Sequence, residues 1–202
     1  MSAFSLFPHQ ILLMEKVKQA YIDGAQGILM VLPTGGGKTA IASKIAQLAR
    51  AKGRRILFLA HRRELILQIS RTLNAFGIGH GQILPDCSET GHPVQVASIS
   101  TLVRRLYPGK YRFDLIVIDE AHHAVSGSGL GSILEALPDA KRLGVTATPC
   151  RLDGRGLGQD AGGYFDALVE GPTVLELIEA GYLGTLGHKL TRAVNVRTVL
   201  EL

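Results

Sequence analysis

The stretch Val31-Leu32-Pro33-Thr34-Gly35-Gly36-Gly37-Lys38-Thr39 decides the fold of this chain. An apolar run at residues 27–32 leads into it and predicts a buried strand, and residues 40–51 follow with a composition typical of a helix. Strand, glycine-rich loop and helix in this order are typical of a phosphate-binding loop. Glycines allow successive backbone N–H groups to point at one anion, and the positive end of the helix dipole adds to the attraction.

Two side chains of this loop have the chemistry that a nucleoside triphosphate with Mg²⁺ requires. Lys38 can reach the β- and γ-phosphates, and the Thr39 hydroxyl can ligate Mg²⁺. Leu32 replaces the first glycine of the usual eight-residue pattern, and the alternative is a glycine-rich turn that binds nothing. We favour the phosphate loop because Gly-Lys-Thr at a helix start has little structural use otherwise. The predicted ATP-binding residues of the loop are Pro33, Thr34, Gly35, Gly36, Gly37, Lys38 and Thr39.

A second polar motif follows the clearest strand pattern of the chain, at residues 113–118. Asp119-Glu120-Ala121-His122-His123 comes directly after it, at the strand end where ligands bind in open parallel sheets. Two adjacent carboxylates raise each other's pKa, and a divalent cation removes that cost. We therefore expect Asp119 to hold Mg²⁺ and Glu120 to orient or deprotonate an attacking water. The alternative is an ordinary charged strand end.

Basic and hydroxyl side chains stand at the starts of two other predicted helices. Arg62 and Arg63 begin one of them, where cations oppose the helix dipole and a phosphate partner would offset the cost. A solvated surface pair is an equally good interpretation of these arginines. Ser100, Thr101 and Arg104 begin the next helix, where hydroxyls commonly contact a nucleic-acid backbone, although one hydroxyl could simply be the N-cap.

The remaining pattern completes an α/β alternation. Further strands are predicted at residues 54–60, 94–98 and 141–146, and helices at residues 11–21, 61–76 and 174–180. Glycine-rich stretches predict a mobile segment at residues 126–131 and a long loop at residues 151–163.

The composition limits the classes of protein to which the chain can belong. Its 202 residues suffice for one domain, and no apolar run approaches the roughly 20 residues of a membrane span. Residues 1–4 show no secretory signal, so we expect a cytoplasmic protein with no membrane partner. Cys87 and Cys150 form no CxxC pair, which argues against a zinc site or a disulfide framework. His80 and His92 flank Cys87 and fit loop positions better than metal-ligand positions.

The charge balance points weakly to a polyanionic partner. The formal net charge of +5 comes from 22 Lys and Arg against 17 Asp and Glu, which fits such a partner without requiring one. Aromatic residues make up only 5% and Trp is absent. Aromatic stacking is therefore not expected to be the main device for binding single-stranded nucleic acid.

Together the motifs resemble, in family order, those of the first motor domain of superfamily-two helicases of the Asp-Glu-Ala-His type. This group includes prokaryotic and phage helicases and restriction-enzyme translocases. Phe7-Pro8-His9-Gln10 is similar to the adenine-reading segment, so Gln10, whose amide offers a donor and an acceptor, is predicted to read adenine rather than to be an ordinary polar helix residue. The other matches are residues 32–39 to motif I, 61–68 to Ia, 97–105 to Ib, 119–122 to II, 146–148 to III, and 149–154 to an extended motif of the subgroup.

The resemblance implies a role for each motif. Thr146 and Thr148 of motif III imply coupling of ATP hydrolysis to strand binding. Motifs Ia and Ib imply a nucleic-acid surface that comprises His61, Arg62, Arg63, Ser100, Thr101 and Arg104. Motifs I and II imply a catalytic group of Lys38, Asp119, Glu120 and His122. The implied cofactors are ATP and Mg²⁺, and the implied partner is nucleic acid, with DNA favoured over RNA.

We therefore expect one α/β domain, a RecA-like P-loop NTPase domain with a mostly parallel sheet and helices on both faces, at residues 1–183. Residues 184–202 are expected to be a tail or the start of a linker. The family places a second motor domain next, with arginines that complete the ATP site, and nothing in the chain matches it. We expect a truncated piece rather than a natural short protein, with a second RecA-like domain supplied in cis or in trans.

The expected function is that of an ATP-binding motor domain of a nucleic-acid helicase or translocase, in which ATP hydrolysis is coupled to strand binding. The isolated chain is expected to be a weakly active ATP hydrolase that cannot unwind. The alternative is a stand-alone nucleotide-binding module without motor activity. A dinucleotide-dependent enzyme is excluded because the glycines do not follow the G-x-G-x-x-G spacing.

Overall fold

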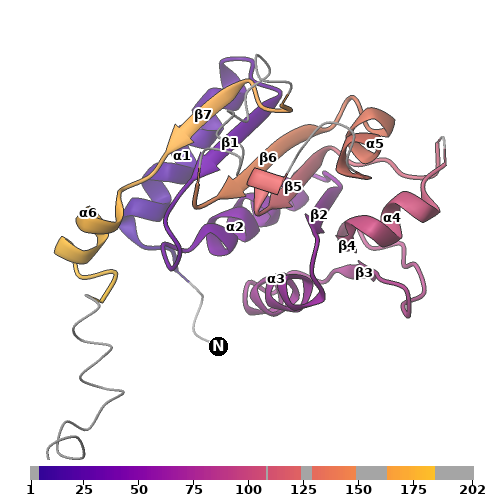
Figure 1. Cartoon of the computed structure of the whole chain (residues 1–202), viewed down its shortest axis with the longest axis horizontal. Helices are drawn as coiled ribbons and strands as arrows, with labels where there is room; N and C mark the ends of the chain where they lie inside the picture. The colour runs from indigo at the N-terminus through magenta and orange to yellow at the C-terminus, as the bar shows by residue number, and fades with distance from the viewer. Residues whose placement is uncertain (1–4, 108, 124–128, 149–162, 185–202) are drawn as a thin grey trace, which may run out of the picture.

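The computed structural model describes residues 5–107, 109–123, 129–148 and 163–184. Within these ranges the chain forms one seven-stranded sheet in which every strand pair is parallel, in the order β3-β4-β2-β5-β6-β1-β7 (Figure 1). The strands are β1 (Gly27–Val31), β2 (Ile56–Ala60), β3 (Gly81–Ile83), β4 (Val94–Ser98), β5 (Leu115–Asp119), β6 (Lys141–Thr146) and β7 (Ala167–Glu170).

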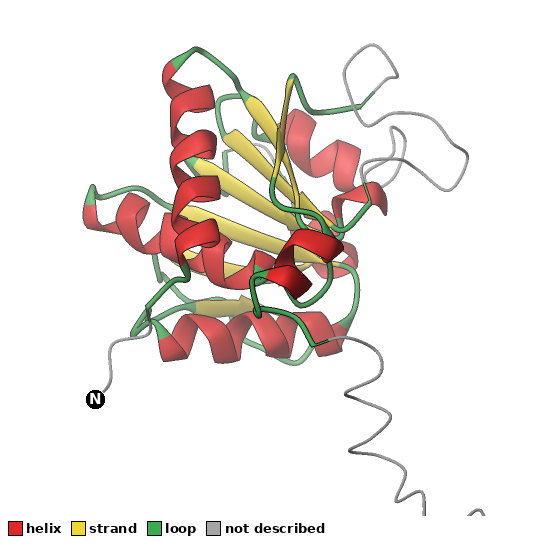
Figure 2. Cartoon of the chain, turned by 90° about the vertical axis from the view of Figure 1, so that its left-hand side faces the viewer, coloured by secondary structure: helices red, strands yellow, loops and turns green. Residues whose placement is uncertain are grey.

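Helices cover both faces of this sheet (Figure 2). One apolar core lies between the sheet and α1 (Pro8–Ile22), α2 (Lys38–Ala51) and α3 (Arg63–Ala75), and a second lies between the sheet and α4 (Ile99–Arg105) and α5 (Gly129–Ala136). The short α6 (Val174–Glu179) joins the first core through its buried Leu177. The expected RecA-like arrangement, a parallel sheet with helices on both faces, is confirmed.

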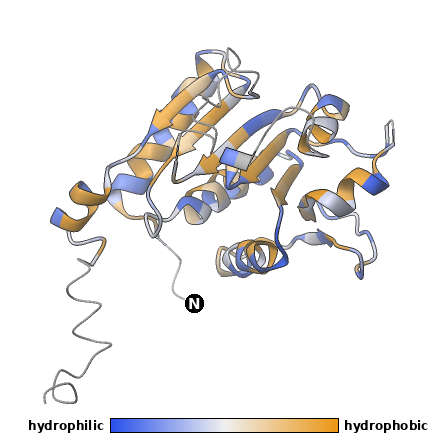
Figure 3. Ribbon diagram, in the orientation of Figure 1, coloured by the Kyte–Doolittle hydropathy of each residue, from blue (hydrophilic) through white to orange (hydrophobic). Residues whose placement is uncertain are grey.

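The apolar runs in the sequence have a direct structural cause. A parallel strand that is covered by helices on both faces needs apolar side chains at consecutive positions rather than at alternate ones. All five residues of β2, β4 and β5 are buried, and the strands are predominantly hydrophobic in Figure 3. The five predicted strands are therefore found as β1, β2, β4, β5 and β6.

Three elements differ from the sequence-based prediction. The edge strands β3 and β7 were not predicted, because segments of three and four residues carry too little pattern. The glycines at 129 and 131 belong to α5, although a mobile segment was predicted for residues 126–131. Leu130, Ile133 and Leu134 of α5 are buried in the second core, and this burial outweighs the low helix propensity of glycine. Residues 126–128 and the predicted loop at 151–162 lie outside the described residues.

The topology brings together the three strand ends that carry predicted site motifs. β6 lies between β1 and β5, so the loop after β1, the carboxylates after β5 and the threonines after β6 share one edge of the sheet. Because all strands are parallel, this edge is the carboxyl edge, where open α/β sheets bind their ligands.

Candidate nucleotide site

The loop between β1 and α2 has the backbone shape of a phosphate cradle. Gly35 and Gly37 have φ angles of 85° and 92°, a left-handed region that side chains with a Cβ rarely adopt. The N–H of Gly36 donates to the carbonyl of Pro33 (3.0 Å), and Gly37 is the N-cap of α2. A Cβ on Gly36 would meet the Leu32 side chain at 2.7 Å, and a Cβ on Gly37 would collide with Nε2 of Gln10. The loop requires its glycines for space as well as for conformation.

Gln10 fastens this loop to α1. Its Nε2 donates to the carbonyl of Gly36 (3.0 Å), its Oε1 accepts from the N–H of Phe7 (3.0 Å), and the residue is only 5% exposed. The sequence predicted that Gln10 reads adenine. In the structure one N–H and one oxygen lone pair of the amide already bind Gly36 and Phe7, and one N–H and one lone pair are left to bind adenine.

Lys38 stands at the start of α2 with its Nζ directed back along the loop. Nζ donates to the carbonyl of Leu32 (3.1 Å). Burial lowers the pKa of Lys38, and the negative charges of Glu120 and Asp119 oppose that shift. The electrostatic coupling joins the predicted phosphate-binding lysine to both predicted catalytic carboxylates, which lie 81 and 82 positions later in the chain. Thr39 occupies the next position of α2 and is half-buried.

Asp119 and Glu120 lie at the carboxyl end of β5 in different environments. Asp119 is 8% exposed, and burial, together with the charge of Glu120, raises its pKa despite the opposing charge of Lys38 and a hydrogen bond from the Glu120 N–H (3.0 Å). The Glu120 side chain is about a third exposed. Glu120 is also the only non-glycine with a positive φ (51°) among the described residues, a conformation that costs about 1–2 kcal/mol.

His122 connects this carboxylate pair to the strand end of β6. Its Nδ1 lies 3.2 Å from Oε2 of Glu120 and 3.1 Å from Oγ1 of Thr146. The Thr146 hydroxyl donates to the carbonyl of Thr148 (2.9 Å) and accepts from the N–H of Thr148 (3.1 Å). The single proton of that hydroxyl is already donated to Thr148, so the hydroxyl can only accept a hydrogen bond from His122. We therefore place a proton on Nδ1 of His122. Thr146 is fully buried, so the contact between the two motifs is fixed inside the domain.

The predicted nucleic-acid residues form a less uniform group. Arg62, the N-cap of α3, is exposed, whereas Arg63 pairs with Asp86 (3.1 Å) across the surface. Ser100 and Arg104 of α4 are also exposed. Thr101 differs from the expectation, because it is only 6% exposed and faces the interior in the first turn of α4. His61, just before Arg62, is exposed and makes contacts of its own.

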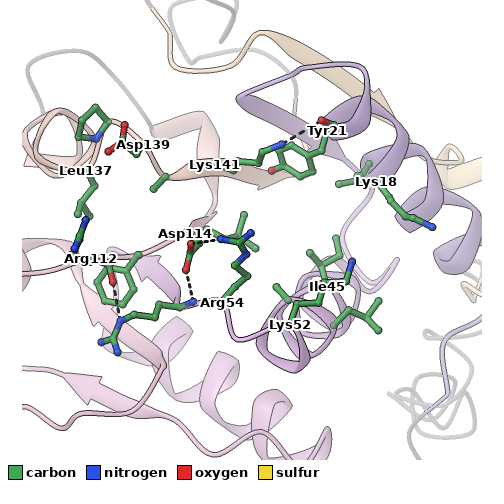
Figure 4. Close-up of a pocket in the computed structure, with 18 of the residues that line it drawn as sticks. Lys18, Tyr21, Ile45, Lys52, Arg54, Arg112, Asp114, Leu137, Asp139 and Lys141 are labelled. Atoms are coloured by element: carbon green, nitrogen blue, oxygen red, sulfur yellow. Dashed lines mark hydrogen bonds and ion pairs between the residues drawn. The ribbon is translucent and has the colours of Figure 1, made fainter.

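A large hollow in the described part of the molecule lies away from this site. It has a volume of about 1370 Å³ and lies at the amino ends of β2, β5 and β6, the opposite edge of the sheet (Figure 4). Arg54 and Asp114 form an ion pair across it (3.0 Å), and Lys141 donates to the carbonyl of Tyr21. None of the predicted site residues lines it. The nucleotide site is therefore assigned from the loop and the carboxylates, which lie at the opposite edge of the sheet from this hollow.

Two contacts of the site were not predicted from the sequence. The Leu183 side chain packs against the phosphate loop, where its Cδ2 would lie 2.8 Å from a Cβ on Gly35. Tyr182 packs on the ring of His9, with 4.5 Å between the centroids. No motif marks these residues, and nearly the whole chain separates them from their neighbours. Only the fold could reveal them.

A magnesium ligand set can be judged from the donors present. The described residues contain no cluster of three His, Cys, Asp or Glu side chains that could hold a metal ion by themselves. Mg²⁺ in phosphate-transfer sites commonly takes only one or two protein ligands and fills its shell with phosphate oxygens and water. Thr39 and Asp119 fit that pattern, and the raised pKa of Asp119 is the cost that a cation would remove.

Comparison with known proteins finds relatives that match most of this chain. The 51.5 kDa protein of a Lactococcus phage (isolate 7-9) is 36% identical over 146 residues, which cover 72% of this chain and 28% of that protein. The putative ATP-dependent helicase IRC3 of Saccharomyces cerevisiae is 36% identical over 183 residues, which cover 80% of this chain and 25% of that protein. The chain therefore spans about a quarter of the length of these curated relatives.

A solved structure shows the same fold. The Type ISP restriction-modification enzyme LlaGI, determined as a nuclease-deletion mutant in complex with a DNA substrate mimic, superposes with a TM-score of 0.68 at 18% identity. The superposition covers 94% of this chain and 22% of that one. A family model described as "Type III restriction enzyme, res subunit" matches residues 3–151, which hold both the phosphate loop and the carboxylate motif. With that match over most of its described length, the chain belongs to the Type III restriction enzyme res subunit family and contains its RecA-like helicase domain.

Proposed function

We propose that this chain is the first motor domain of an ATP-driven nucleic-acid helicase or translocase of the Asp-Glu-Ala-His type. The observation that carries the proposal is the meeting of three motifs at one sheet edge. The negative charges of Asp119 and Glu120 act on the pKa of Lys38, and His122 contacts both Glu120 and Thr146. The positive charge of Lys38, the candidate base Glu120 and the contact from His122 to the buried Thr146 therefore lie at the sheet edge where a loop-bound triphosphate would bind.

Each residue has a specific part in the proposed reaction. The loop N–H groups and Lys38 bind and orient the triphosphate, and Glu120 positions the attacking water and accepts its proton. Thr39 and Asp119 would hold Mg²⁺, which supplies charge neutralisation for the developing phosphate oxygens. The partly exposed Glu120 carboxylate can reach solvent water, whereas the buried Asp119 carboxylate suits a cation.

His122 and Thr146 provide the proposed coupling between hydrolysis and strand binding. The Nδ1–H of His122 is shared between Glu120 and Thr146. A change in the position or protonation of the Glu120 carboxylate would therefore alter the hydrogen bond to Thr146 at the end of β6. Thr148 is tied to the same hydroxyl by two hydrogen bonds. A displacement of this segment would thereby change the position of the base.

Nucleic acid is the proposed partner, with DNA favoured over RNA. The solved LlaGI structure with the same fold is a complex with a DNA substrate mimic. In this chain the exposed Arg62, at the N-cap of α3, and the exposed Arg104 of α4 supply charge for a phosphate backbone. A second RecA-like domain, in cis or in trans, is proposed to complete the ATP site. Separately, no helix in the described parts of the chain is long and apolar enough to cross a membrane. The cytoplasmic location expected from the sequence stays a prediction.

The test of the ATP site compares two substitutions. Lys38→Ala should weaken Mg·ATP binding, whereas Glu120→Gln should leave binding near normal and lower single-turnover hydrolysis by on the order of 10²-fold or more. Lys38 contacts ground-state phosphates, while Glu120 acts on the attacking water. Calorimetric titration and single-turnover assays with enzyme in excess measure the two effects.

Matched controls keep this test specific. Lys44→Ala on the same helix and Glu135→Gln on the exposed side of α5 should change neither quantity. Equal loss of binding in the Lys38 and Glu120 variants would contradict the assignment of roles.

The proposed strand surface is tested by salt dependence. Arg62→Ala should weaken nucleic-acid binding equally for all sequences and reduce the slope of log K against log salt by about one unit, because a phosphate contact releases counterions but reads no base. Arg71→Ala, on the same helix but outside the predicted surface, is the control. An unchanged slope in Arg62→Ala would return Arg62 to the solvated-surface interpretation.

The alternative, a stand-alone nucleotide-binding module, makes a different prediction. Such a module binds Mg·ATP but shows no thermodynamic coupling between ATP and nucleic acid. Measuring DNA affinity with and without bound nucleotide separates the two functions. The link from Glu120 through His122 to Thr146 favours the motor, because a simple binding module has no use for it.

A further inference from the structure

The hollow at the amino edge of the sheet has a positively charged lining that the proposed ATP reaction does not use. It lies where α1 and α2 end and where β2, β5 and β6 begin (Figure 4). Six basic side chains line it against three acidic ones, and the basic ones are Lys18, Lys52, Arg54, Arg55, Arg112 and Lys141. The negative ends of the two helix dipoles contribute roughly half a charge each, so the excess stays positive.

Two of the three acidic side chains already have partners. The Asp114 carboxylate accepts from the N–H of Arg55 (2.7 Å) and from Nη1 of Arg54 (3.0 Å), and these bonds hold its pKa below the usual aspartate range. Glu15 pairs with Lys18 on the surface of α1 (3.1 Å). Among the described residues, no carboxylate forms an ion pair with the other four cations, Lys52, Arg55, Arg112 and Lys141.

Aromatic rings and carbonyls hold two of these four cations in place. Nζ of Lys141 lies 4.8 Å from the ring centroid of Tyr21 and donates to the Tyr21 carbonyl (3.3 Å). The Arg55 guanidinium lies 5.8 Å from the ring centroid of Phe113, and its Nε donates to the carbonyl of Arg112 (2.9 Å). A lysine has three N–H donors and an arginine five, so both retain donors for a ligand. Because these cations are already positioned, an anion that binds them loses less side-chain entropy.

The surface between the cations is apolar. Val17, Leu115 and Leu137 are buried in the lining, whereas Ile22 and Leu48 are 66% and 45% exposed at it. Exposed aliphatic side chains beside a buried apolar surface are typical of an area that another chain covers. The volume of about 1370 Å³ also exceeds the roughly 300–1,000 Å³ of small-molecule pockets. The hollow therefore suits a polypeptide segment better than a metabolite.

Nucleic acid fits this lining less well than a peptide does. Single strands bind by stacking their bases on open aromatic faces, but here Lys141 and Arg55 already lie over Tyr21 and Phe113, and Phe113 is only 7% exposed. A phosphate backbone also has no groups that would cover exposed leucine and isoleucine. An acidic amphipathic segment offers carboxylates to the cations and aliphatic side chains to the apolar surface.

We propose that this amino-edge hollow is a docking site for an acidic amphipathic peptide segment of a partner domain or subunit. Carboxylates of the segment pair with Lys52, Arg55, Arg112 and Lys141, and its aliphatic side chains cover Leu48. The hollow and the phosphate loop lie at opposite ends of α2, a helix of 14 residues and about 21 Å. The docked segment therefore leaves the nucleotide site open.

The experiment measures binding of labelled peptides of roughly 12 residues to the full 202-residue chain by fluorescence anisotropy. Three peptides share leucines at helical spacing and carry Glu, Gln or Lys at the remaining positions. We expect the Glu peptide to bind on the order of tenfold more tightly than the Gln peptide, and the Lys peptide to bind most weakly, because the lining is positive.

Substitutions locate the binding. Arg112→Gln and Lys52→Gln, both at exposed positions, should each weaken the Glu peptide roughly two- to fivefold, the scale of exposed ion pairs. Lys16→Gln, exposed on α1 but outside the lining, is their control. Leu48→Ser should weaken all three peptides, whereas Leu67→Ser, at a similarly exposed leucine of α3 outside the hollow, should weaken none.

The outcomes decide between docking of a peptide and its rivals. Mg·ATP affinity should stay unchanged in every variant, because all of them lie away from the phosphate loop. No binding of the Glu peptide, or equal binding of the Glu and Gln peptides, would overturn the proposal. Single-stranded DNA that displaces the Glu peptide, and that loses affinity in Arg112→Gln and Lys52→Gln but not in Leu48→Ser, would overturn it in favour of a nucleic-acid site.

Discussion

At the scale of single residues, Asp119 shows the conflict between folding and function most clearly. Its carboxyl is buried beside Glu120, and the burial raises its pKa in the folded chain. A folded-state pKa above the unfolded value means that the contribution to stability is fully present below the ordinary aspartate pKa and is lost as pH rises through the raised one. At neutral pH the ionised carboxylate therefore destabilises the nucleotide-free domain.

Asp119→Asn should accordingly raise the free energy of unfolding at pH 7 by roughly 1 kcal/mol, the usual scale of single-residue effects. The amide keeps the shape, and its Oδ1 can still accept the Glu120 N–H. Urea unfolding at pH 7 and at pH 4 measures the difference, which should shrink at the lower pH. Asp139→Asn, at an exposed position before β6, should change neither value. A loss of stability in Asp119→Asn at pH 7 would contradict the proposed destabilisation.

At the scale of elements, the joint between α1 and the phosphate loop depends on one close approach. Gly37 has a φ of 92°, and a Cβ added to it would collide with Nε2 of Gln10. Gly24 has a φ of 108°, but a Cβ added to it would meet no other atom within 4 Å. Both positions disfavour a side chain for conformational reasons, but only Gly37 disfavours it for packing reasons as well.

Gly37→Ala should therefore destabilise the domain by about 1–3 kcal/mol more than Gly24→Ala, the cost of overpacking. In the Gly37→Ala background, Gln10→Ala should cost less than it does alone, because the amide would already be displaced from Gly36. A double-mutant cycle by urea unfolding gives the coupling, expected at about 0.5–3 kcal/mol. Equal costs for the two glycines, or strict additivity with Gln10, would mean that the joint is unimportant.

At the scale of the whole molecule, the ATP site is proposed to need a second domain. The chain spans about a quarter of the curated relatives it matches, so their activities concern far longer proteins. An arginine supplied from outside is worth roughly 10³–10⁵ in rate in related phosphate-loop enzymes.

The 202-residue chain alone should consequently bind Mg·ATP, hydrolyse it very slowly and unwind nothing, since one domain offers part of a strand track and no cleft to close. Multiple-turnover ATPase assays with and without single- and double-stranded DNA and RNA, at stated salt, test this. Robust strand-stimulated hydrolysis by the chain alone would refute the half-motor proposal and point to an arginine from a second copy. Arg151 and Arg155, which lie outside the described residues, would be the first candidates.

The sequence by itself determined the α/β class, five of the seven strands in the described residues, and the two motifs from which the nucleotide site is proposed. It could do so because a strand buried on both faces must be apolar at every position, and because a glycine loop before a helix is local. The phosphate loop at residues 32–39 and the carboxylates at residues 119–120 are contiguous motifs, so they can be identified without knowing their neighbours in the fold. The short strands β3 and β7 could not be predicted, because they are strands through their pairing with β4 and β1 and not through a pattern in their own composition.

The tertiary structure alone decided which side chains meet. Gln10 became the fastening of the loop because α1 packs against β1 and α2, and Thr101 faced inward because the rotation of α4 is set by its packing. His122 reached Thr146 because β6 lies next to β5, and Tyr182 reached Phe7 across 175 positions because α6 folds back onto the first core. Such contacts join residues that are distant in the chain, and their distances are fixed by the order of the strands rather than by any local pattern.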